Sequence, residues 1–100
     1  MVADDSAGDR SAARAILEGA GYRVLEARDG NEALEVVRDG APDLVLLDVV
    51  MPKIGGLETC RILKAQSQGE YLPVLMVSTR SSVAARVDGL RSGADDYLGK

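Results

Sequence analysis

The chain has 100 residues, of which 46% are hydrophobic and 28% charged, a composition typical of an ordinary globular protein with one modest core. We therefore expect one domain over residues 1–100, with no room for a second catalytic domain. The net charge of −4 excludes a basic surface for direct binding to nucleic acid, and the lack of histidine excludes the commonest metal ligand and general base.

The first quarter of the chain is predicted to form a strand, a helix and a second strand. A short strand is expected over residues 1–3, and the helix after it is expected to end near Gly21. The second strand is expected over residues 22–27. The buried stripe of the helix is predicted from the i, i+3, i+4 and i+7 spacing of Ala13, Ile16, Leu17 and Ala20.

A second helix and a third strand are predicted next. Asp29 is expected to cap the helix, because Glu32 three residues later completes a capping-box pattern. Its buried face is expected at Ala33, Val36 and Val37, and Gly40 and Pro42 are expected to end it. Residues 44–47 form an unbroken apolar run, as expected of a central parallel strand buried on both faces, and Asp48 ends it.

Two more helices and two more strands complete the predicted pattern. The third helix follows the glycines at 55 and 56, a buried strand is expected over residues 73–77, and a short last strand contains Tyr97 and Leu98. The buried stripes are Leu57, Cys60 and Leu63 in the third helix and Val83, Val87, Leu90 and Ala94 in the fourth, which Gly93 is placed to end. Cys60, the one cysteine, is expected to be a buried structural thiol.

Short apolar runs that alternate with helices predict βαβ units and a parallel sheet, an α/β doubly wound fold. In such a sheet ligands bind outside the carboxyl ends of the strands. We therefore expect the polar groups that follow four of the predicted strands to converge on one site. These groups are Asp4 and Asp5, Asp48, Ser78 and Lys100.

Three carboxylates in one site raise one another's pKa, so Asp4, Asp5 and Asp48 require a cation. With oxygen ligands and no histidine or second cysteine, Mg²⁺ is the natural candidate. Such an ion would polarise a phosphoryl donor, while Lys100 stabilises the transferring group and Asp48 attacks it as a nucleophile. The residue types therefore predict phosphoryl transfer.

Four segments in order, ADDS, LVLLDVVMPKIGG, PVLMVSTR and GADDYLGK, resemble the receiver domains of response regulators in two-component signalling. Ser78 and Lys100 follow Asp48 at intervals of 30 and 52 residues, which agree with that family. The resemblance covers nearly the whole chain. It implies a CheY-like, flavodoxin-like fold with a five-stranded parallel sheet in the order 2-1-3-4-5.

The resemblance also implies roles for individual residues. Asp48 would be the phospho-acceptor, Asp5 a direct ligand of Mg²⁺, Asp4 a ligand through water, and Val50 a ligand through its backbone carbonyl. Ser78 would bond the phosphoryl group.

Further family positions are filled by Lys100, the catalytic lysine, by Tyr97, the aromatic switch whose rotamer follows Ser78, and by Pro52 in the loop after the acceptor. Val50 and Arg80 would flank the phosphoryl group, and we expect them to slow its hydrolysis by screening the attacking water.

In function, the resemblance implies a cytoplasmic signalling switch rather than a metabolic enzyme. A sensor histidine kinase or a histidine phosphotransfer domain would donate the phosphoryl group, the altered surface would regulate a downstream partner, and an intrinsic autophosphatase activity would reset it. No apolar run approaches the roughly 20 residues of a membrane helix, so no membrane contact is expected.

The chain departs from the family at both ends. The first strand is short, and the chain stops at Lys100, where the family continues into a fifth helix. We expect apolar side chains such as Val2 and Leu98 to be uncovered as a result, and the edge strand to offer free backbone groups. The expected consequence is self-association, as a homodimer or as a loosely packed, aggregation-prone protein.

Three other functions compete with the receiver interpretation. A pseudo-receiver would bind partners without accepting phosphate. A phosphohydrolase similar to the haloacid dehalogenases needs a second aspartate two residues after its nucleophile, where Val50 stands. A flavodoxin-like electron carrier needs a phosphate-binding loop rich in Ser, Thr and Gly after the first strand, and the sequence has none there.

Overall fold

Five strands and four helices alternate along the residues that the computed structural model describes, which are 1–51, 53–67, 72–78 and 82–99. The strands are β1 (Val2–Ala3), β2 (Glu26–Ala27), β3 (Val45–Asp48), β4 (Val74–Ser78) and β5 (Asp96–Gly99). The helices are α1 (Ala7–Gly19), α2 (Gly30–Gly40), α3 (Gly56–Gln66) and α4 (Val83–Arg91). All strand pairs are parallel and their order is β2-β1-β3-β4-β5, which confirms the predicted doubly wound sheet.

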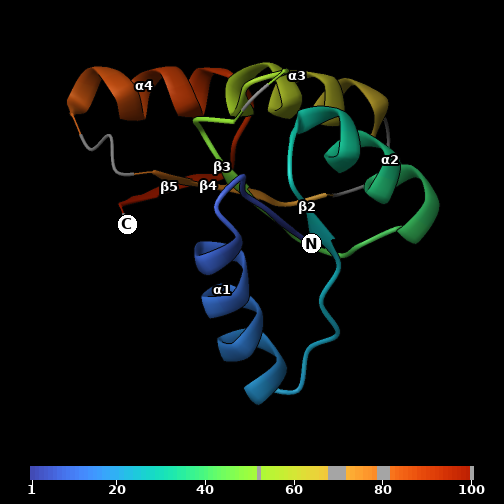
Figure 1. Ribbon diagram of the computed structural model, residues 1–100. Helices are drawn as coiled ribbons and strands as arrows, with labels where there is room; N and C mark the ends of the chain where they lie inside the picture. The colour runs from blue at the N-terminus through green and yellow to red at the C-terminus, as the bar shows by residue number, and fades with distance from the viewer. Residues whose placement is uncertain (52, 68–71, 79–81, 100) are drawn as a thin grey trace.

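The two faces of the sheet are covered unequally. Helices α2, α3 and α4 lie on one face, and α1 is the one described helix on the other (Figure 1). Val45, Leu47 and Met76 point toward the three helices and are fully buried, whereas Leu46 and Leu75 on the α1 face are half-buried. The expectation that residues 44–47 are buried on both faces is therefore wrong for the α1 face, because one helix is too narrow to cover it.

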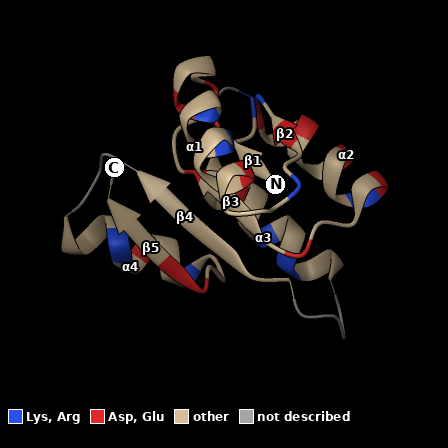
Figure 2. Ribbon diagram, turned by 90° about the horizontal axis from the view of Figure 1, so that it is seen from below, with Lys and Arg blue, Asp and Glu red and all other residues tan. Residues whose placement is uncertain are grey.

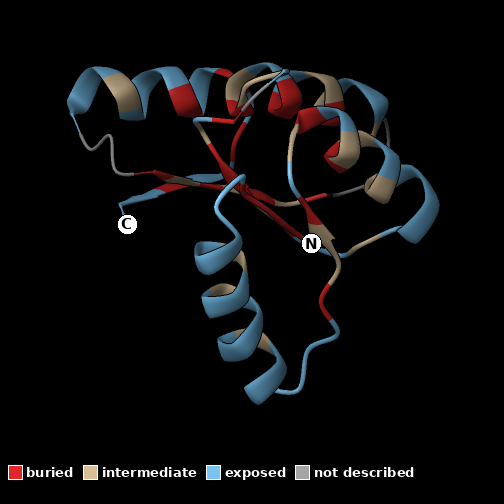
Figure 3. Ribbon diagram, viewed as in Figure 1, coloured by how far each residue is buried: buried red, intermediate tan, exposed pale blue. Residues whose placement is uncertain are grey.

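The core lies between the sheet and the three-helix layer (Figure 3). Cys60 and Leu63 of α3 are fully buried in it, as predicted, and burial raises the pKa of the Cys60 thiol. Helix α1, in contrast, has no buried residue. Its predicted stripe is wrong at Ala20, which is exposed, and at Ile16, which is 74% exposed, because α1 touches the sheet along a narrow line at β1.

Strand β2 is shorter than the predicted strand over residues 22–27. It contains only Glu26 and Ala27, which pair with Val2 and Ala3 of β1. Because β1 offers two residues for pairing, the ladder reaches back only to the carbonyl of Leu25, which accepts a hydrogen bond from the amide of Val2 at 2.8 Å, and Tyr22 is 65% exposed. Strand propensity alone therefore did not make a strand here.

Side-chain caps fix where three of the helices begin. Ser6 accepts a hydrogen bond from the amide of Asp9 at 3.2 Å, and Ser82 caps α4 in the same way. Asp29 accepts one from the amide of Glu32 at 2.8 Å, which confirms the predicted cap of α2. These bonds satisfy amide groups that the first turn of a helix leaves without a partner.

Helix α4 turns a different face to the sheet from the one predicted. Val83, Val87 and Leu90 are 79%, 39% and 49% exposed, and Gly89 is buried instead. A Cβ atom on Gly89 would lie 2.4 Å from Cδ2 of Tyr97, so the helix approaches β5 more closely than any side chain allows. The large apolar residues therefore point away from the core.

The expectation that Val2 and Leu98 are uncovered is confirmed for Leu98 and wrong for Val2. Leu98 is 44% exposed, but Val2 is 4% exposed because α1 packs over β1. Charged residues lie on the helices, on the loops and on β5, whereas β4 carries none (Figure 2). Within the described ranges, no helix combines the length and apolar character needed to span a membrane.

Candidate functional site

Three carboxylates meet at the carboxyl edge of the sheet. Asp4 and Asp5 follow β1, and Asp48 is the last residue of the neighbouring strand β3. Each offers a carboxylate oxygen, and these oxygens all lie within 4.8 Å of one another. Asp4 and Asp48 are 6% and 8% exposed, and Asp5 is exposed. The structure thus brings together the three acids that the sequence placed at one edge.

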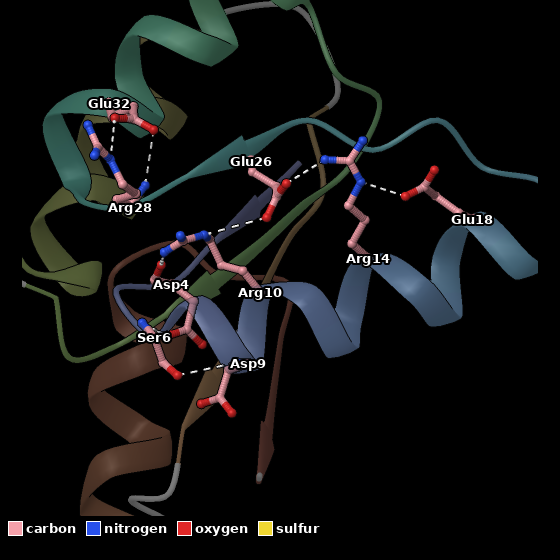
Figure 4. Close-up of polar contacts among 9 residues, drawn as sticks. All are labelled: Asp4, Ser6, Asp9, Arg10, Arg14, Glu18, Glu26, Arg28 and Glu32. Carbon is pink, nitrogen blue, oxygen red and sulfur yellow. Dashed lines mark hydrogen bonds and ion pairs between the residues drawn. The ribbon is translucent and has the colours of Figure 1, made fainter.

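Asp4 is held by three hydrogen bonds, made with β2, with the turn after β1 and with α1. The amide of Asp4 donates to the carbonyl of Ala27 at 3.1 Å, which continues the pairing of β1 with β2. The amide of Ser6 donates to Oδ1 of Asp4 at 2.9 Å, and Nη1 of Arg10 donates to the carbonyl of Asp4 at 2.7 Å (Figure 4). Both the carboxylate and the backbone of Asp4 are therefore fixed.

Asp48 is positioned by its strand and by the start of α3. It lies opposite Val77 of β4, and its Oδ1 accepts a hydrogen bond from the amide of Val50 at 3.3 Å. A Cβ atom on Gly56 would lie 2.1 Å from the carbonyl oxygen of Asp48, so only glycine permits α3 to begin this close. The Val50 side chain is 50% exposed beside the site.

Ser78 and Tyr97 lie on the adjacent strands β4 and β5. Ser78 is the last residue of β4, is 1% exposed and lies opposite Gly99. Tyr97 is 3% exposed and packs against Gly89, with the guanidinium carbon of Arg86 6.0 Å from the centre of its ring. The ring is thus buried under α4. Pro52, Arg80 and Lys100 lie outside the described residues.

The donor set fits a hard divalent cation. The cluster offers oxygen atoms alone, and the chain contains no histidine to favour a softer metal. Negative charges at this spacing repel one another, most strongly where two of them are buried. A bound cation of the size and charge of Mg²⁺ would relieve that repulsion.

Several residues that shape the site were not anticipated. Ser6 could have been found from the spacing of Ser6 and Asp9, a cap signal. Arg10 could not, because its contact depends on how α1 lies over the sheet edge. Nor could the ion pair of Lys53 and Asp29, 3.5 Å apart, which links the loops after β2 and β3. The amide of Glu32 and this lysine lower the pKa of Asp29.

Comparison with known proteins identifies close relatives. Residues 1–100 match the model of the response regulator receiver domain. The chain is 48% identical over its full length to the response regulator MprA of Mycolicibacterium vanbaalenii, of which it spans 42%. It therefore covers less than half of the curated relatives that it matches.

Solved structures of receiver proteins have the same fold as this chain. The chemotaxis protein CheY4 of Vibrio cholerae superposes with a TM-score of 0.92 and 35% identity, over 99% of this chain and 82% of that one. A chain of the CheX–CheY–BeF3–Mg²⁺ complex of Borrelia burgdorferi superposes with a TM-score of 0.90 and 26% identity, over 99% and 75%. The fold, the acidic edge and the relatives agree, and the chain belongs to the response regulator receiver domain family.

Proposed function

We propose that this receiver domain accepts a phosphoryl group on Asp48 in a reaction that depends on Mg²⁺. The observation that carries the proposal is the cluster of Asp4, Asp5 and Asp48 at the carboxyl edge of the sheet, with oxygens within 4.8 Å. Asp48 is central in it, since it ends β3 between the acids that follow β1 and the hydroxyl that ends β4.

The proposed step is the attack of a carboxylate oxygen of Asp48 on the phosphorus of a phosphohistidine. The P–N bond breaks as the new P–O bond forms, and the electron pair leaves with the imidazole, which then takes up a proton. The 100 residues contain no histidine, so the phosphohistidine of this step lies outside them. We assign the role of donor to a sensor histidine kinase or a histidine phosphotransfer domain.

Other residues of the site orient and neutralise the transferring group. Asp5 and Asp48 would hold Mg²⁺ directly, Asp4 through water, and Val50 through its carbonyl. The ion would supply positive charge beside the phosphoryl oxygens. Support for this part comes from the family and from the CheY complex that contains BeF3 and Mg²⁺.

Ser78 and Lys100 would bond the phosphoryl oxygens, and Tyr97 would follow Ser78 as the switch. The burial of Ser78 at the end of β4 and of Tyr97 on the next strand supports a coupled pair. The outcome would be a changed surface around β4 and β5 that a downstream partner reads. The existence of that downstream partner is part of the proposal, and so is a longer protein that contains this chain.

The test is labelling with acetyl phosphate followed by intact-mass measurement. We expect one phosphoryl group on the wild type with Mg²⁺ and none with EDTA. Asp48→Asn should abolish labelling, whereas Asp43→Asn, an exposed aspartate near the opposite end of β3, should not. Equal labelling of Asp48→Asn and wild type would overturn the assignment. A folded wild type that binds Mg²⁺ but takes no label would favour the pseudo-receiver instead.

A further inference from the structure

A chain of ion pairs links α1 to β2, and a hydrogen bond from Arg10 joins this chain to the acidic site. Arg10 contacts both Asp4 and Glu26, and Arg14 contacts Glu26 and Glu18 (Figure 4). Glu26 is therefore shared by two arginines one helical turn apart. Of the two, only Arg10 also reaches the backbone of a residue in the acidic cluster.

The sheet register explains why Glu26 faces these arginines. Glu26 lies opposite Val2, and Ala27 lies opposite Ala3. Since successive side chains of a strand alternate between faces, the burial of Ala27 in the three-helix core leaves Glu26 on the face of α1. Positions 10 and 14 are four residues apart on one side of that helix, so both reach the same carboxylate.

Arg10 is the least exposed member of this chain of ion pairs. Its side chain is 14% exposed, while those of Glu26 and Arg14 are 29% and 44% exposed. Nη1 donates to the carbonyl of Asp4 at 2.7 Å, and Nε lies 3.5 Å from Oε1 of Glu26. The guanidinium thus holds the backbone of Asp4 from one side, while the amide of Ser6 holds its carboxylate.

We propose that Arg10, anchored by Glu26, is a positioning residue for the divalent-cation site. The inference rests on the proposed function and adds a residue to it: Arg10 fixes the turn that presents Asp4 and Asp5, without touching the ion. Residues that orient the ligands of a metal affect its affinity without binding it.

Two effects of Arg10 on the cation have opposite signs, which makes the inference testable. A positive charge near the site repels a cation, so its removal by itself would tighten Mg²⁺ binding. A lost hydrogen bond to Asp4 loosens the turn and weakens binding. Glu26 offsets part of the charge of Arg10, while the hydrogen bond of Arg10 acts directly on Asp4, so we expect the positioning effect to dominate.

The first measurement is calorimetric titration of the chain with MgCl2 at constant ionic strength. We expect Arg10→Ala to weaken Mg²⁺ binding about tenfold, the lower end of the usual effect of an orienting partner. Arg14→Ala is the matched control: it breaks an ion pair to the same Glu26 but has no contact with Asp4, and its affinity should stay within about twofold of wild type. Unchanged or tighter binding by Arg10→Ala would overturn the inference.

Two further variants separate position from charge and from folding. Arg10→Lys keeps the charge but offers one nitrogen for two partners, so we expect an affinity between those of wild type and Arg10→Ala. Glu26→Ala leaves the contact with Asp4 but removes the anchor, and should weaken binding by about threefold. In the double variant Arg10→Ala, Glu26→Ala the losses of Mg²⁺ affinity from the two substitutions should not add, because both act through one contact. Additive losses would count against the proposal.

The final readout distinguishes this inference from the proposed function. In acetyl phosphate labelling, Arg10→Ala should need more Mg²⁺ for half-maximal rate but reach the wild-type rate at saturation. If the wild type itself binds no Mg²⁺ and takes no label, the proposed function fails. If the wild type does both and Arg10→Ala matches it at every Mg²⁺ concentration, only the role of Arg10 fails.

Discussion

Asp48 is a carboxylate that the fold buries beside two others of the same sign. The amide of Val50 gives Oδ1 one hydrogen bond, and strand pairing fixes the backbone. Hydrogen bonds of this kind stabilise the charged form, but they do not cancel the repulsion from Asp4 and Asp5. We therefore expect the acidic edge to be more stable when the proposed cation is bound.

This repulsion predicts an unusual response to one substitution. Without metal, Asp5→Asn should raise the melting temperature, because it removes one of three like charges within 4.8 Å. Saturating Mg²⁺ should raise the melting temperature of the wild type, and it should raise that of the variant much less. Thermal melts with EDTA and with Mg²⁺ measure this. Asp88→Asn, an exposed site on α4, should shift neither curve. A lower metal-free melting temperature for Asp5→Asn would contradict the explanation.

Gly89 makes a second prediction at the scale of a residue. Gly89→Ala should lower the free energy of unfolding by about 1 to 3 kcal/mol, because the new Cβ would meet the Tyr97 ring and force α4 outward. Urea unfolding measures the change. In Gly8→Ala in α1 the new Cβ would lie 3.9 Å from Oγ of Ser6, an ordinary contact. The free energy of unfolding should therefore rise by about 0.5 to 1 kcal/mol. If both variants were stabilised, the close packing of α4 would be refuted.

At the scale of elements, Lys64 and Asp95 join α3, β4 and the loop before β5. Nζ of Lys64 donates to the carbonyl of Leu72 at 2.8 Å and to Oδ2 of Asp95 at 2.7 Å. The same Oδ2 accepts from the amide of Val74 at 2.8 Å. The lysine bond and then this amide lower the pKa of Asp95.

This arrangement predicts a pH dependence of stability. A carboxyl group with a lowered folded pKa stabilises the fold above its unfolded pKa of about 3.9, and the contribution is lost as the pH falls through the folded value. Asp95→Asn should therefore cost about 1 kcal/mol at pH 7, a figure reduced for partial exposure, and almost nothing at the acid end. Urea unfolding across this range measures it. Asp39→Asn, whose partner Arg38 is 70% exposed, should cost nothing at either pH.

Features that depend on local pattern could be predicted from the sequence, whereas features that depend on how the elements pack could not. The cap at Asp29, the burial of Cys60 and the convergence of Asp4, Asp5 and Asp48 follow from spacing and from the rule for parallel sheets. The exposed face of α4 does not, because it depends on how closely Gly89 approaches Tyr97, a contact made across eight residues of chain.

At the scale of the whole molecule, the unequal cover of the sheet leaves an apolar region beside α1. Leu46 and Val77 are half-buried there, Leu98 is 44% exposed, and a groove of about 280 Å³ extends between α1 and the strands. Apolar surface of this kind favours association, at about 25 cal/mol for each Å² that is covered.

We therefore expect the 100-residue chain to self-associate as its concentration rises, which sedimentation velocity measures. Leu98→Lys should reduce association because it places a charge on the α1 face of the sheet. Val83→Lys, at an exposed apolar position on α4, should not. A monodisperse wild type, or an effect of Val83→Lys alone, would show that the α1 face is not the surface involved.

The position of β1 between β2 and β3 has a consequence for synthesis. The first strand leaves the ribosome before either neighbour exists, and its bonds to Leu46 and Leu47 wait for a segment more than 40 residues later. At the usual rate of translation this delay is roughly 2 to 9 seconds, during which β1 lacks its β3 neighbour. Asp4 and Asp5 are thus made early, and the proposed cation site is complete only when Asp48 has emerged beside them.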